Sequence, residues 1–331
     1  MDTDTLSRPQ PAATRRRDLL ALAVIARRLV AEDVVLLTLS AEDGQPLPHW
    51  APGAHVDVSV DGGAYVRQYS LCGDPRDDDR WHIAVLREPN GRGGSAAIHE
   101  KCFVGTTLWV SQPVNRFPLR EARHVVFIAG GIGITPFLTM IGALERAGRS
   151  WELHYAGRKP ASMAFAGELE LWHGSRASLY PKCEGRPLAL ASVLRNLPIG
   201  TEVYACGPAR LLQEVENRCL AADVKPHMER FAAPARPGPD VDEEAEGSFE
   251  VHLARTGVTI VVEPGQSILN AAEAAGADVF GSCLEGVCGT CETRVLEGTP
   301  DHRDFVLDGA PADTMMICVS RCKGSRLILD V

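Results

Sequence analysis

The sequence lacks several features that would place it quickly in a class. No apolar run in its 331 residues approaches the length of a transmembrane helix, so we expect no membrane-spanning segment. Positive charge is in deficit, with 34 Lys and Arg against 43 Asp and Glu, and no basic stripe with interleaved aromatic residues appears. These absences argue against a nucleic-acid-binding protein. The net charge of −9 suits a protein partner with a basic docking face better.

Signals for oxygen chemistry and for secretion are also missing. There is no 2-His-1-carboxylate candidate near a pocket motif and no haem signature, so we do not expect the chain itself to oxygenate a substrate. A long chain without a signal peptide does not use its ten cysteines as a secreted disulfide framework, which favours the bacterial cytoplasm. The segment 14-TRRRDLL-20 resembles an export signal. A second strand-like run at 34–40 follows it closely, which favours the start of a folded domain over an export signal. Residues 1–17 are predicted to be a disordered tail.

What the sequence does contain is a cysteine loop, 283-CLEGVCGTC-291, with a fourth cysteine further on. The four cysteines are spaced C-x4-C-x2-C, then 26 residues, then C, which is the plant-type ferredoxin spacing: Cys283, Cys288, Cys291 and Cys318. A [2Fe–2S] cluster needs four thiolates, and glycines in the loop let the backbone pass close to it. We therefore predict a [2Fe–2S] site.

Three other interpretations of the cysteines are open. A zinc site would more naturally use two C-x2-C pairs, whereas Cys318 and Cys322 are separated by three residues. A thioredoxin-like pair needs a helix after it, but 292-ETRVLEG-298 has the pattern of a strand. Unrelated buried cysteines are the third alternative. Cys322 is expected to pack rather than to bind metal.

Residues 18–119 have the texture of a small antiparallel β-barrel. Runs of strand length lie at 20–29, 34–40, 55–60, 65–71 and 81–88, with turn residues between them. In 67-RQYS-70, strand alternation puts Arg67 and Tyr69 on one face, which could hold a phosphate and a flat ring. The glycine-rich turn in 91-GRGGSAAIHE-100 leads into a helix whose first N–H groups could bind phosphate. The alternative is a solvated strand and a flexible loop.

Residues 120–232 alternate strands and helices, which predicts a parallel sheet covered by helices. The strands are expected at 124–130, 151–158 and 202–207, and the helices at 131–148, 162–172 and 208–223. Ligands of such sheets bind at the carboxyl ends of the strands, where 130-GGIGITP-136 and 205-ACGP-208 fall. Because the full dinucleotide fingerprint is absent, a simple packing turn is the alternative for these glycines.

The remaining chain predicts a linker and a third domain. Residues 233–247 are acidic and rich in proline, which is typical of a linker. Residues 248–331 give a hairpin, a helix capped by Ser267, the cysteine loop, a strand and a closing strand at 326–331, a β-grasp-like order. The predicted fold class is therefore multi-domain: an antiparallel barrel, a parallel α/β sheet and a β-grasp ferredoxin domain.

These motifs together resemble the phthalate dioxygenase reductase family, which includes vanillate demethylase reductases, over residues 20–331. The resemblance rests on 67-RQYSL-71, 92-RGGS-95, 130-GGIGITP-136, 205-ACGP-208, 229-ERF-231 and the ferredoxin cysteines, in that order. It implies FMN in the barrel, NADH on the α/β domain and [2Fe–2S] in the last domain.

The resemblance also implies roles for individual residues. Those expected to contact FMN are Arg67, Gln68, Tyr69, Ser70, Ala84, Val85, Leu86, Arg92, Gly93, Gly94 and Ser95. Those expected to bind the nicotinamide nucleotide are Gly131, Gly133, Arg158, Cys206, Gly207 and Pro208. Thr135 and Cys206 would orient the reacting rings, and Phe231 would cover the flavin. Where this chain has Leu86, family members often have lysine.

The implied function is electron supply. By resemblance, the chain is an NADH-dependent reductase that passes electrons through FMN and [2Fe–2S] to a separate Rieske-type aromatic-ring oxygenase or O-demethylase. We expect it to be a monomer. A reductase for a haem-thiolate monooxygenase is an alternative, and a non-catalytic electron carrier or redox sensor is another. Glu285 and Glu292 are candidates for partner docking, with ordinary surface charge as the alternative.

Overall fold

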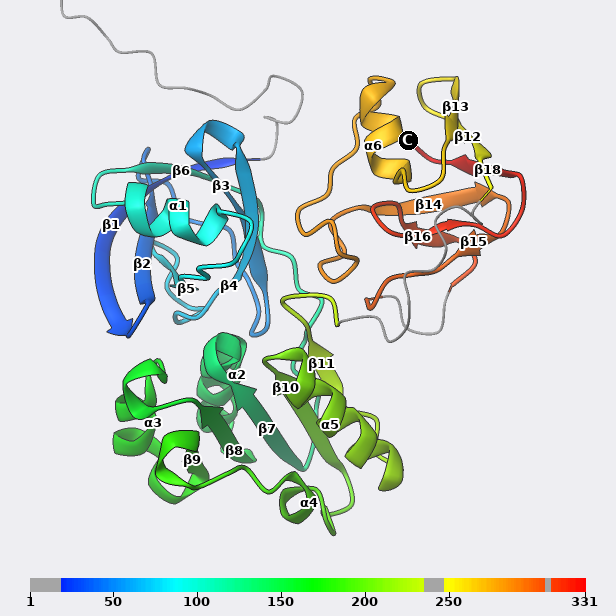
Figure 1. Cartoon of the computed structure of the whole chain (residues 1–331). Helices are drawn as coiled ribbons and strands as arrows, with labels where there is room; N and C mark the ends of the chain where they lie inside the picture. Colours follow the sequence, from blue (N-terminus) through cyan, green and yellow to red (C-terminus); the bar gives the residue numbers. More distant parts are fainter. Residues whose placement is uncertain (1–18, 235–246, 307–310) are drawn as a thin grey trace, which may run out of the picture. The chain divides into compact units, whose positions relative to one another are not determined.

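The computed structural model describes residues 19–234, 247–306 and 311–331 (Figure 1). The predicted tail at 1–17 and nearly all of the predicted linker at 233–247 lie outside these residues. The chain divides into two compact units, one containing the residues up to Cys206 with 216–227, the other containing 207–215 with 228–331. The domain boundaries 18–119, 120–232 and 248–331 remain predictions.

The first part of the chain forms the expected antiparallel barrel. Its strands are β1 (Leu20–Ala31), β2 (Val34–Ala41), β3 (His55–Val60), β4 (Tyr65–Ser70), β5 (Trp81–Leu86) and β6 (Thr107–Val110). They are ordered β4-β3-β6-β1-β2-β5, and a bridge between Leu71 and Ile83 links the two ends of this order. Alternating residues such as Leu37, Leu39 and Val56 fill the barrel and are fully buried. The helix α1 (Gly94–Lys101) follows the glycine turn.

A five-stranded sheet follows in the order β11-β10-β7-β8-β9. Its strands are β7 (His124–Gly130), β8 (Ser150–Gly157), β9 (Ala177–Pro181), β10 (Thr201–Cys206) and β11 (His227–Glu229). The pairs β10–β7, β7–β8 and β8–β9 are parallel. Six of the seven residues of β7 are buried, as expected for a strand covered on both faces.

The helices of this sheet are α2 (Thr135–Arg146), α3 (Ala166–His173), α4 (Leu190–Val193) and α5 (Ala209–Ala221). A 3-10 turn, η3 (Gly131–Ile134), replaces the first part of the helix predicted at 131–148. The helix predicted at 162–172 begins only at Ala166, because Phe165 has a left-handed backbone with φ of 62°. Strand β9 was not predicted from the sequence.

The last part of the chain has the predicted β-grasp arrangement, with sheet order β13-β12-β18-β14-β16. Its elements are β12 (Phe249–Leu253), β13 (Val258–Val262), α6 (Ile268–Ala274), β14 (Glu292–Glu297), β16 (Thr314–Met316) and β18 (Arg326–Leu329), with a small second sheet of β15 (Pro300–Asp301) and β17 (Arg321–Cys322). As predicted, the Ser267 side chain caps α6 by accepting a hydrogen bond from the N–H of Asn270 at 3.1 Å. The fold class expected from the sequence is confirmed.

Across residues 19–234, 247–306 and 311–331, no helix has the length and apolar character needed to cross a bilayer.

Candidate functional site

The two phosphate-binding candidates of the barrel lie together. The Arg67 guanidinium on β4 donates a hydrogen bond from Nη2 to the carbonyl oxygen of Arg92 at 2.9 Å, although 25 residues separate them. It also donates from Nη1 to the Val66 carbonyl and lies 5.8 Å from the centre of the Tyr65 ring. A cation is therefore fixed beside the start of α1, which is the combination that favours a phosphate.

Two glycines allow the side chains of Arg67 and Tyr65 to lie close to the turn before α1. A Cβ on Gly94 would lie 2.6 Å from Cγ of Arg67, and one on Gly93 would lie 3.0 Å from the Tyr65 ring. Gly93 also has φ of 81°, which side chains rarely adopt. Tyr65 was not predicted as a site residue, although its position two residues before Arg67 on the same strand face could have indicated it.

The barrel residues also contain a polar atom that fits a ligand. Nε2 of Gln68 is buried and has no hydrogen-bond partner among the described residues. A buried donor without a partner costs stability, so a bound acceptor at this position would relieve the cost. An isoalloxazine ring, which carries carbonyl oxygens and ring nitrogens, supplies such acceptors. The residues present therefore fit a flavin.

The other predicted flavin residues lie on the same strands or at the start of α1. Ala84 and Val85 are buried on β5, and Leu86 ends that strand half-buried. Ser70 is buried at the end of β4, and burial raises the pKa of the neighbouring Tyr69, which keeps its phenol neutral. Ser95 accepts a hydrogen bond from the Glu88 N–H at 3.0 Å, which joins the chain after β5 to α1.

The predicted nucleotide residues lie at carboxyl ends of the parallel strands. Gly131 follows β7 with φ of 56° and has open space around the position of a Cβ. Gly133 is buried in η3. Thr135 is 3% exposed, and its hydroxyl donates to the Ile132 carbonyl at 3.1 Å, so it stabilises the first turn of α2. This edge therefore has the small residues that let a dinucleotide approach the backbone.

The second glycine-bearing strand end lies beside the first. Cys206 ends β10, pairs in register with Ala129 of β7 and is fully buried. Gly207 and Pro208 follow, and the N–H groups of Leu211 and Leu212 both donate to the Pro208 carbonyl. Arg158 comes directly after β8 with an exposed side chain, a suitable place for a cation that meets a nucleotide phosphate. The roles of these residues, and of the exposed Phe231, remain predictions.

The structure brings the four predicted cluster ligands together. The ligands are close enough to affect one another's ionisation: Cys283 raises the pKa of Cys288, and Cys283 and Cys291 act in opposite directions on the pKa of Cys318. All ten cysteines of the chain are described, and all are free. Cys322 stands apart and is half-buried, and its Sγ contacts the Gly324 N–H at 3.2 Å, in line with a packing role.

The loop backbone points donors at the sulfurs. The N–H groups of Glu285 and Val287 donate to Sγ of Cys283 at 3.3 and 3.5 Å, and the Thr290 N–H donates to Sγ of Cys288 at 3.5 Å. Such donors favour the thiolate form that metal binding requires. Leu284 takes φ of 59°, which is costly for leucine and lets the loop turn tightly.

The electrostatics of the ligands also fit a metal centre. Hydrogen bonding to Cys283, together with burial, raises the pKa of Cys288, so these sulfurs are unfavourable as neighbouring thiolates without a cation. Among the described residues, no group of three or more His, Cys, Asp or Glu side chains has the spacing of a metal site, which does not separate zinc from a cluster. A [2Fe–2S] cluster distributes four thiolates over two irons. After Cys291 the chain continues as the strand β14, unlike a thioredoxin motif.

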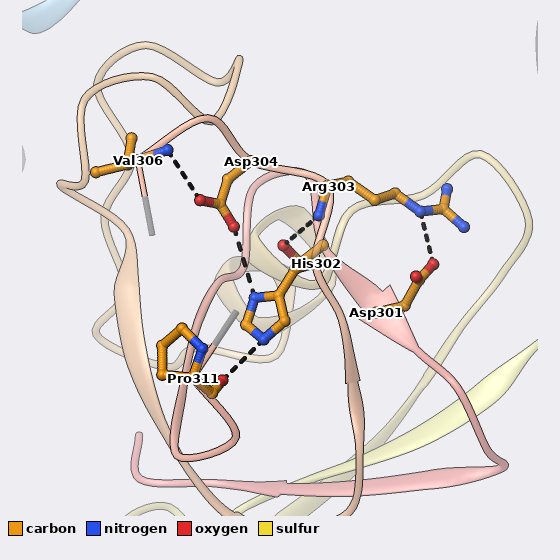
Figure 2. A network of polar contacts seen from close by, with 7 residues as sticks. Asp301, His302, Arg303, Asp304, Val306 and Pro311 are labelled. Atoms are coloured by element: carbon orange, nitrogen blue, oxygen red, sulfur yellow. Dashed lines mark hydrogen bonds and ion pairs between the residues drawn. The ribbon is translucent and has the colours of Figure 1, made fainter. Parts of the chain in front are cut away.

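A network of polar contacts follows β15 in the chain (Figure 2). The Asp304 carboxylate accepts from the Val306 N–H at 3.0 Å and lies 3.6 Å from Nδ1 of His302, whose Nε2 contacts the Pro311 carbonyl at 2.8 Å. Next to it, the Phe305 N–H donates to the carbonyl of Gly286 at 2.8 Å. Sequence patterns gave no signal for the hydrogen bond between Phe305 and Gly286, which joins residues 19 apart.

One of the two predicted docking carboxylates has an internal role. The Glu285 side chain accepts a hydrogen bond from the Ala233 N–H at 3.0 Å. Both residues are half-buried. Glu285 is therefore not simply a surface charge presented to a partner, and its contact with the chain after β11 was not expected.

His55 is a further buried polar residue of the barrel. It pairs in register with Ser70 at the end of β4 and is 5% exposed. Burial, with a smaller effect of Arg116, lowers the pKa of its imidazole to about 4. Its Nδ1 has no hydrogen-bond partner among the described residues. A neutral imidazole therefore lies at the end of the strand that carries the predicted flavin residues.

Comparison with known proteins agrees with this geometry. A family model described as a 2Fe-2S iron-sulfur cluster binding domain matches residues 251–323, a span that contains all four predicted ligands. The phenoxybenzoate dioxygenase subunit beta of Ectopseudomonas oleovorans is 45% identical over 307 residues, which are 91% of this chain and 94% of that protein.

Solved structures match the whole chain. A phthalate dioxygenase reductase, described as a modular structure for electron transfer from pyridine nucleotides to [2Fe-2S], is 34% identical with a TM-score of 0.71, and covers 97% of this chain and 100% of that one. An intact type IV self-sufficient cytochrome P450 monooxygenase is 40% identical with a TM-score of 0.87. That match covers 100% of this chain but only 43% of the monooxygenase.

Proposed function

Because the chain belongs to the phthalate dioxygenase reductase family, we propose that it is the reductase component of a two-component Rieske-type aromatic-ring oxygenase or O-demethylase. It is an NADH-dependent oxidoreductase, and FMN, NADH and a [2Fe–2S] cluster are its cofactors, as the family resemblance implies. The identity of the oxygenase class and the residues that serve each cofactor are the parts proposed here.

The single observation that carries the proposal is that one chain holds three suitable sites. The Arg67–Arg92 contact builds an anion site on the barrel, β7 and β10 are followed directly by glycines, and Cys318 lies close to Cys283 and Cys291 of the cysteine loop. FMN, when bound, accepts a hydride from NADH and supplies electrons singly, as a [2Fe–2S] cluster requires.

The protein's own residues bind the cofactors and orient their reacting groups. Arg67 and the N–H groups at the start of α1 would hold the FMN phosphate, and the Gln68 amide would donate to the ring. Thr135, at the start of α2, and Cys206, at the end of β10, are both buried and would set the position of the nicotinamide rather than exchange protons. The cysteines would bind the cluster as thiolates, and the N–H donors of the loop backbone would stabilise this ionised form.

The order of the sites can be tested with Cys288→Ser. The variant should lose reduction of the oxygenase or of another one-electron protein acceptor, because the cluster lacks a ligand. Reduction of a small dye by NADH should continue at the flavin. Equal loss of both activities would contradict the proposed order.

A reductase for a haem-thiolate monooxygenase is the second candidate, and the match to the self-sufficient P450 along the whole chain favours it. The two candidates differ in the acceptor. Mixing the reductase with purified Rieske oxygenases and with P450 haem domains, and measuring NADH consumption that depends on substrate, separates them. Coupling only to a P450 would replace the first candidate by the second.

We also propose that the chain acts as a monomer in the bacterial cytoplasm and docks only transiently on its oxygenase. Reducing conditions there would keep its ten free cysteines reduced. Light scattering during size-exclusion chromatography, with and without the oxygenase, tests both the monomer and the transient complex.

A further inference from the structure

The turn between β1 and β2 contacts the turn that follows β8. The Glu32 N–H donates a hydrogen bond to the carbonyl of Ala161 at 2.8 Å. The Glu32 carboxylate lies 2.5 Å from Nζ of Lys159 and forms an ion pair with it. We call residues 158–162 the β8 turn. Both contacts lie within the first compact unit, where they join the barrel to the parallel sheet.

Packing holds the end of the β1–β2 hairpin in this position. Val34, the first residue of β2, is 2% exposed and belongs to the same hydrophobic core as Phe127 of the sheet. Ala31, the last residue of β1, packs against that core. A second ion pair joins Arg28 of β1 to Glu168 of α3 at 3.5 Å. The carboxylate at the end of the hairpin is therefore presented to the β8 turn by a fixed strand pair.

The β8 turn is also ordered by its own contacts. The N–H and the hydroxyl of Ser162 both donate to the carbonyl of Lys159, at 3.0 and 2.9 Å. Gly157 ends β8, and a Cβ there would clash with the side chain of Met163, so glycine lets the chain fold back closely after the strand. The two cations of the turn, Arg158 and Lys159, are therefore carried by a fixed backbone.

The β8 turn lies at the edge of the sheet where we propose that the nucleotide binds. Gly130, at the end of β7, pairs in register with Ala156 of β8. In sheets of this kind the pyrophosphate lies after the first strand, and residues after the next strand meet the adenosine ribose. An acidic residue there favours NADH, whereas a cation accommodates the 2′-phosphate of NADPH. Arg158 and Lys159 by themselves would therefore favour NADPH.

The two cations differ in their electrostatic surroundings. The Arg158 side chain is exposed and makes no hydrogen bond or ion pair with any described residue, so it is available to a nucleotide. Lys159, in contrast, is paired with the Glu32 carboxylate. A phosphate monoester carries about 1.5 to 2 negative charges near pH 7. A 2′-phosphate that approached Lys159 would meet this carboxylate, and like charges repel.

We propose that Glu32 determines the preference for NADH over NADPH, because it neutralises Lys159 and adds a negative charge beside the cations that would otherwise bind the 2′-phosphate. The proposal rests on the proposed function, in which a nicotinamide nucleotide binds at the carboxyl ends of these strands. NADH has a hydroxyl in place of that phosphate and is not repelled. Specificity then comes from repulsion of the wrong ligand. Since Glu32 acts through Lys159, it is a positioning residue.

Reduction of a dye at the flavin, with NADH or NADPH as the donor, tests this preference. Glu32→Gln removes the charge but keeps the N–H that donates to Ala161. It should raise kcat/KM for NADPH about fivefold, through a lower KM, and change the value for NADH less than about twofold, a modest effect because the pair is exposed. The gain should shrink at high salt, because exposed charges are screened. Bound-flavin absorbance confirms that each variant is folded.

Two further variants separate the ion pair from a general effect of charge. Asp61→Asn breaks a matched pair of the barrel, in which Asp61 and Lys101 lie 2.6 Å apart with side chains 40% and 54% exposed, against 49% and 51% for Glu32 and Lys159. It removes the same charge and should leave the ratio of NADPH to NADH activity unchanged. Adding Lys159→Gln to Glu32→Gln should return the NADPH value to near wild type, because the released cation is then absent.

Binding of the oxidised nucleotides, which cannot reduce the flavin, gives a readout without electron transfer. Calorimetric titration should show NADP⁺ binding about fivefold more tightly to Glu32→Gln than to the wild type, and NAD⁺ binding equally to both. An unchanged NADPH value in Glu32→Gln, an equal gain in Asp61→Asn, a gain that persists in the double variant, or an equal change for both nucleotides would overturn the role of Glu32. If neither NADH nor NADPH reduces the wild-type flavin, the proposed function fails, whereas the NADP⁺ titration still tests the ion pair.

Discussion

Arg67 and Arg92 are joined by a 2.9 Å hydrogen bond from the guanidinium of the first to the carbonyl of the second. The bond fixes a strand cation against the glycine turn before α1. We expect Arg67→Ala to weaken FMN binding by about 2 kcal/mol, since it removes a charge-assisted contact and the order of the turn. Arg67→Lys should recover only part of this, because lysine lacks the planar fork. Fluorescence titration of flavin-free protein with FMN gives the dissociation constants.

Gly94 tests the same site by steric means. An alanine Cβ there would lie 2.6 Å from Cγ of Arg67, so Gly94→Ala should displace that side chain and weaken FMN binding about tenfold. Gly142→Ala is the control, because its Cβ would meet only the flexible end of Arg146 at 3.4 Å in α2. The control should bind FMN normally and be slightly more stable. Equal FMN affinity in both variants would argue against a phosphate site at this turn.

His55 predicts a pH dependence of stability. Its pKa falls from 6.5 in the unfolded chain to about 4 in the folded protein, so between these values the unfolded state binds the extra proton. Stability from this residue is present above pH 6.5 and is lost as the pH falls toward 4, by about 3 kcal/mol in total. Urea unfolding at pH 7 and pH 5 should show a smaller loss in His55→Gln. Identical losses would mean that His55 is not buried in its neutral form.

The exposed apolar side chains of Leu284 and Phe305 indicate which surface binds the oxygenase. They are 49% and 41% exposed, one directly after the ligand Cys283 and the other bonded through its N–H to Gly286 of the cysteine loop. Changing either to serine should slow electron transfer to the oxygenase several-fold by removing apolar contact, with dye reduction intact. Val261→Ser is the control, because Val261 is 52% exposed on β13. Slowing in the control alone would contradict this docking face.

The fold was predictable where local pattern decides structure. Strand alternation gave β3 (His55–Val60) with its observed ends, and a continuous apolar run gave β7 (His124–Gly130). The start of α3 was wrong because the left-handed Phe165 depends on its surroundings rather than on helix propensity. Short strands such as β6 (Thr107–Val110) and β9 (Ala177–Pro181) were missed, since four or five residues show too little alternation.

Likewise, only some features of the candidate site could be predicted from the sequence. Cys283 belongs to a motif whose spacing reflects its chemistry, so it could be named from the sequence, whereas Arg92 and Gly131 were named by the family resemblance. Gln68 was named by resemblance. Only the structure shows that its buried amide nitrogen has no hydrogen-bond partner among the described residues. The bond from Ala233 to Glu285 joins residues 52 apart, and no local pattern specifies such a pair.

The most direct test of the electron path is an anaerobic NADH titration of the purified protein, followed by visible absorbance. NADH should bleach the flavin band, and the cluster bands should then follow within the same molecule without any added acceptor. A flavin band that bleaches while the cluster bands stay oxidised, or a spectrum that NADH does not change, would contradict the path from NADH through FMN to the cysteine loop.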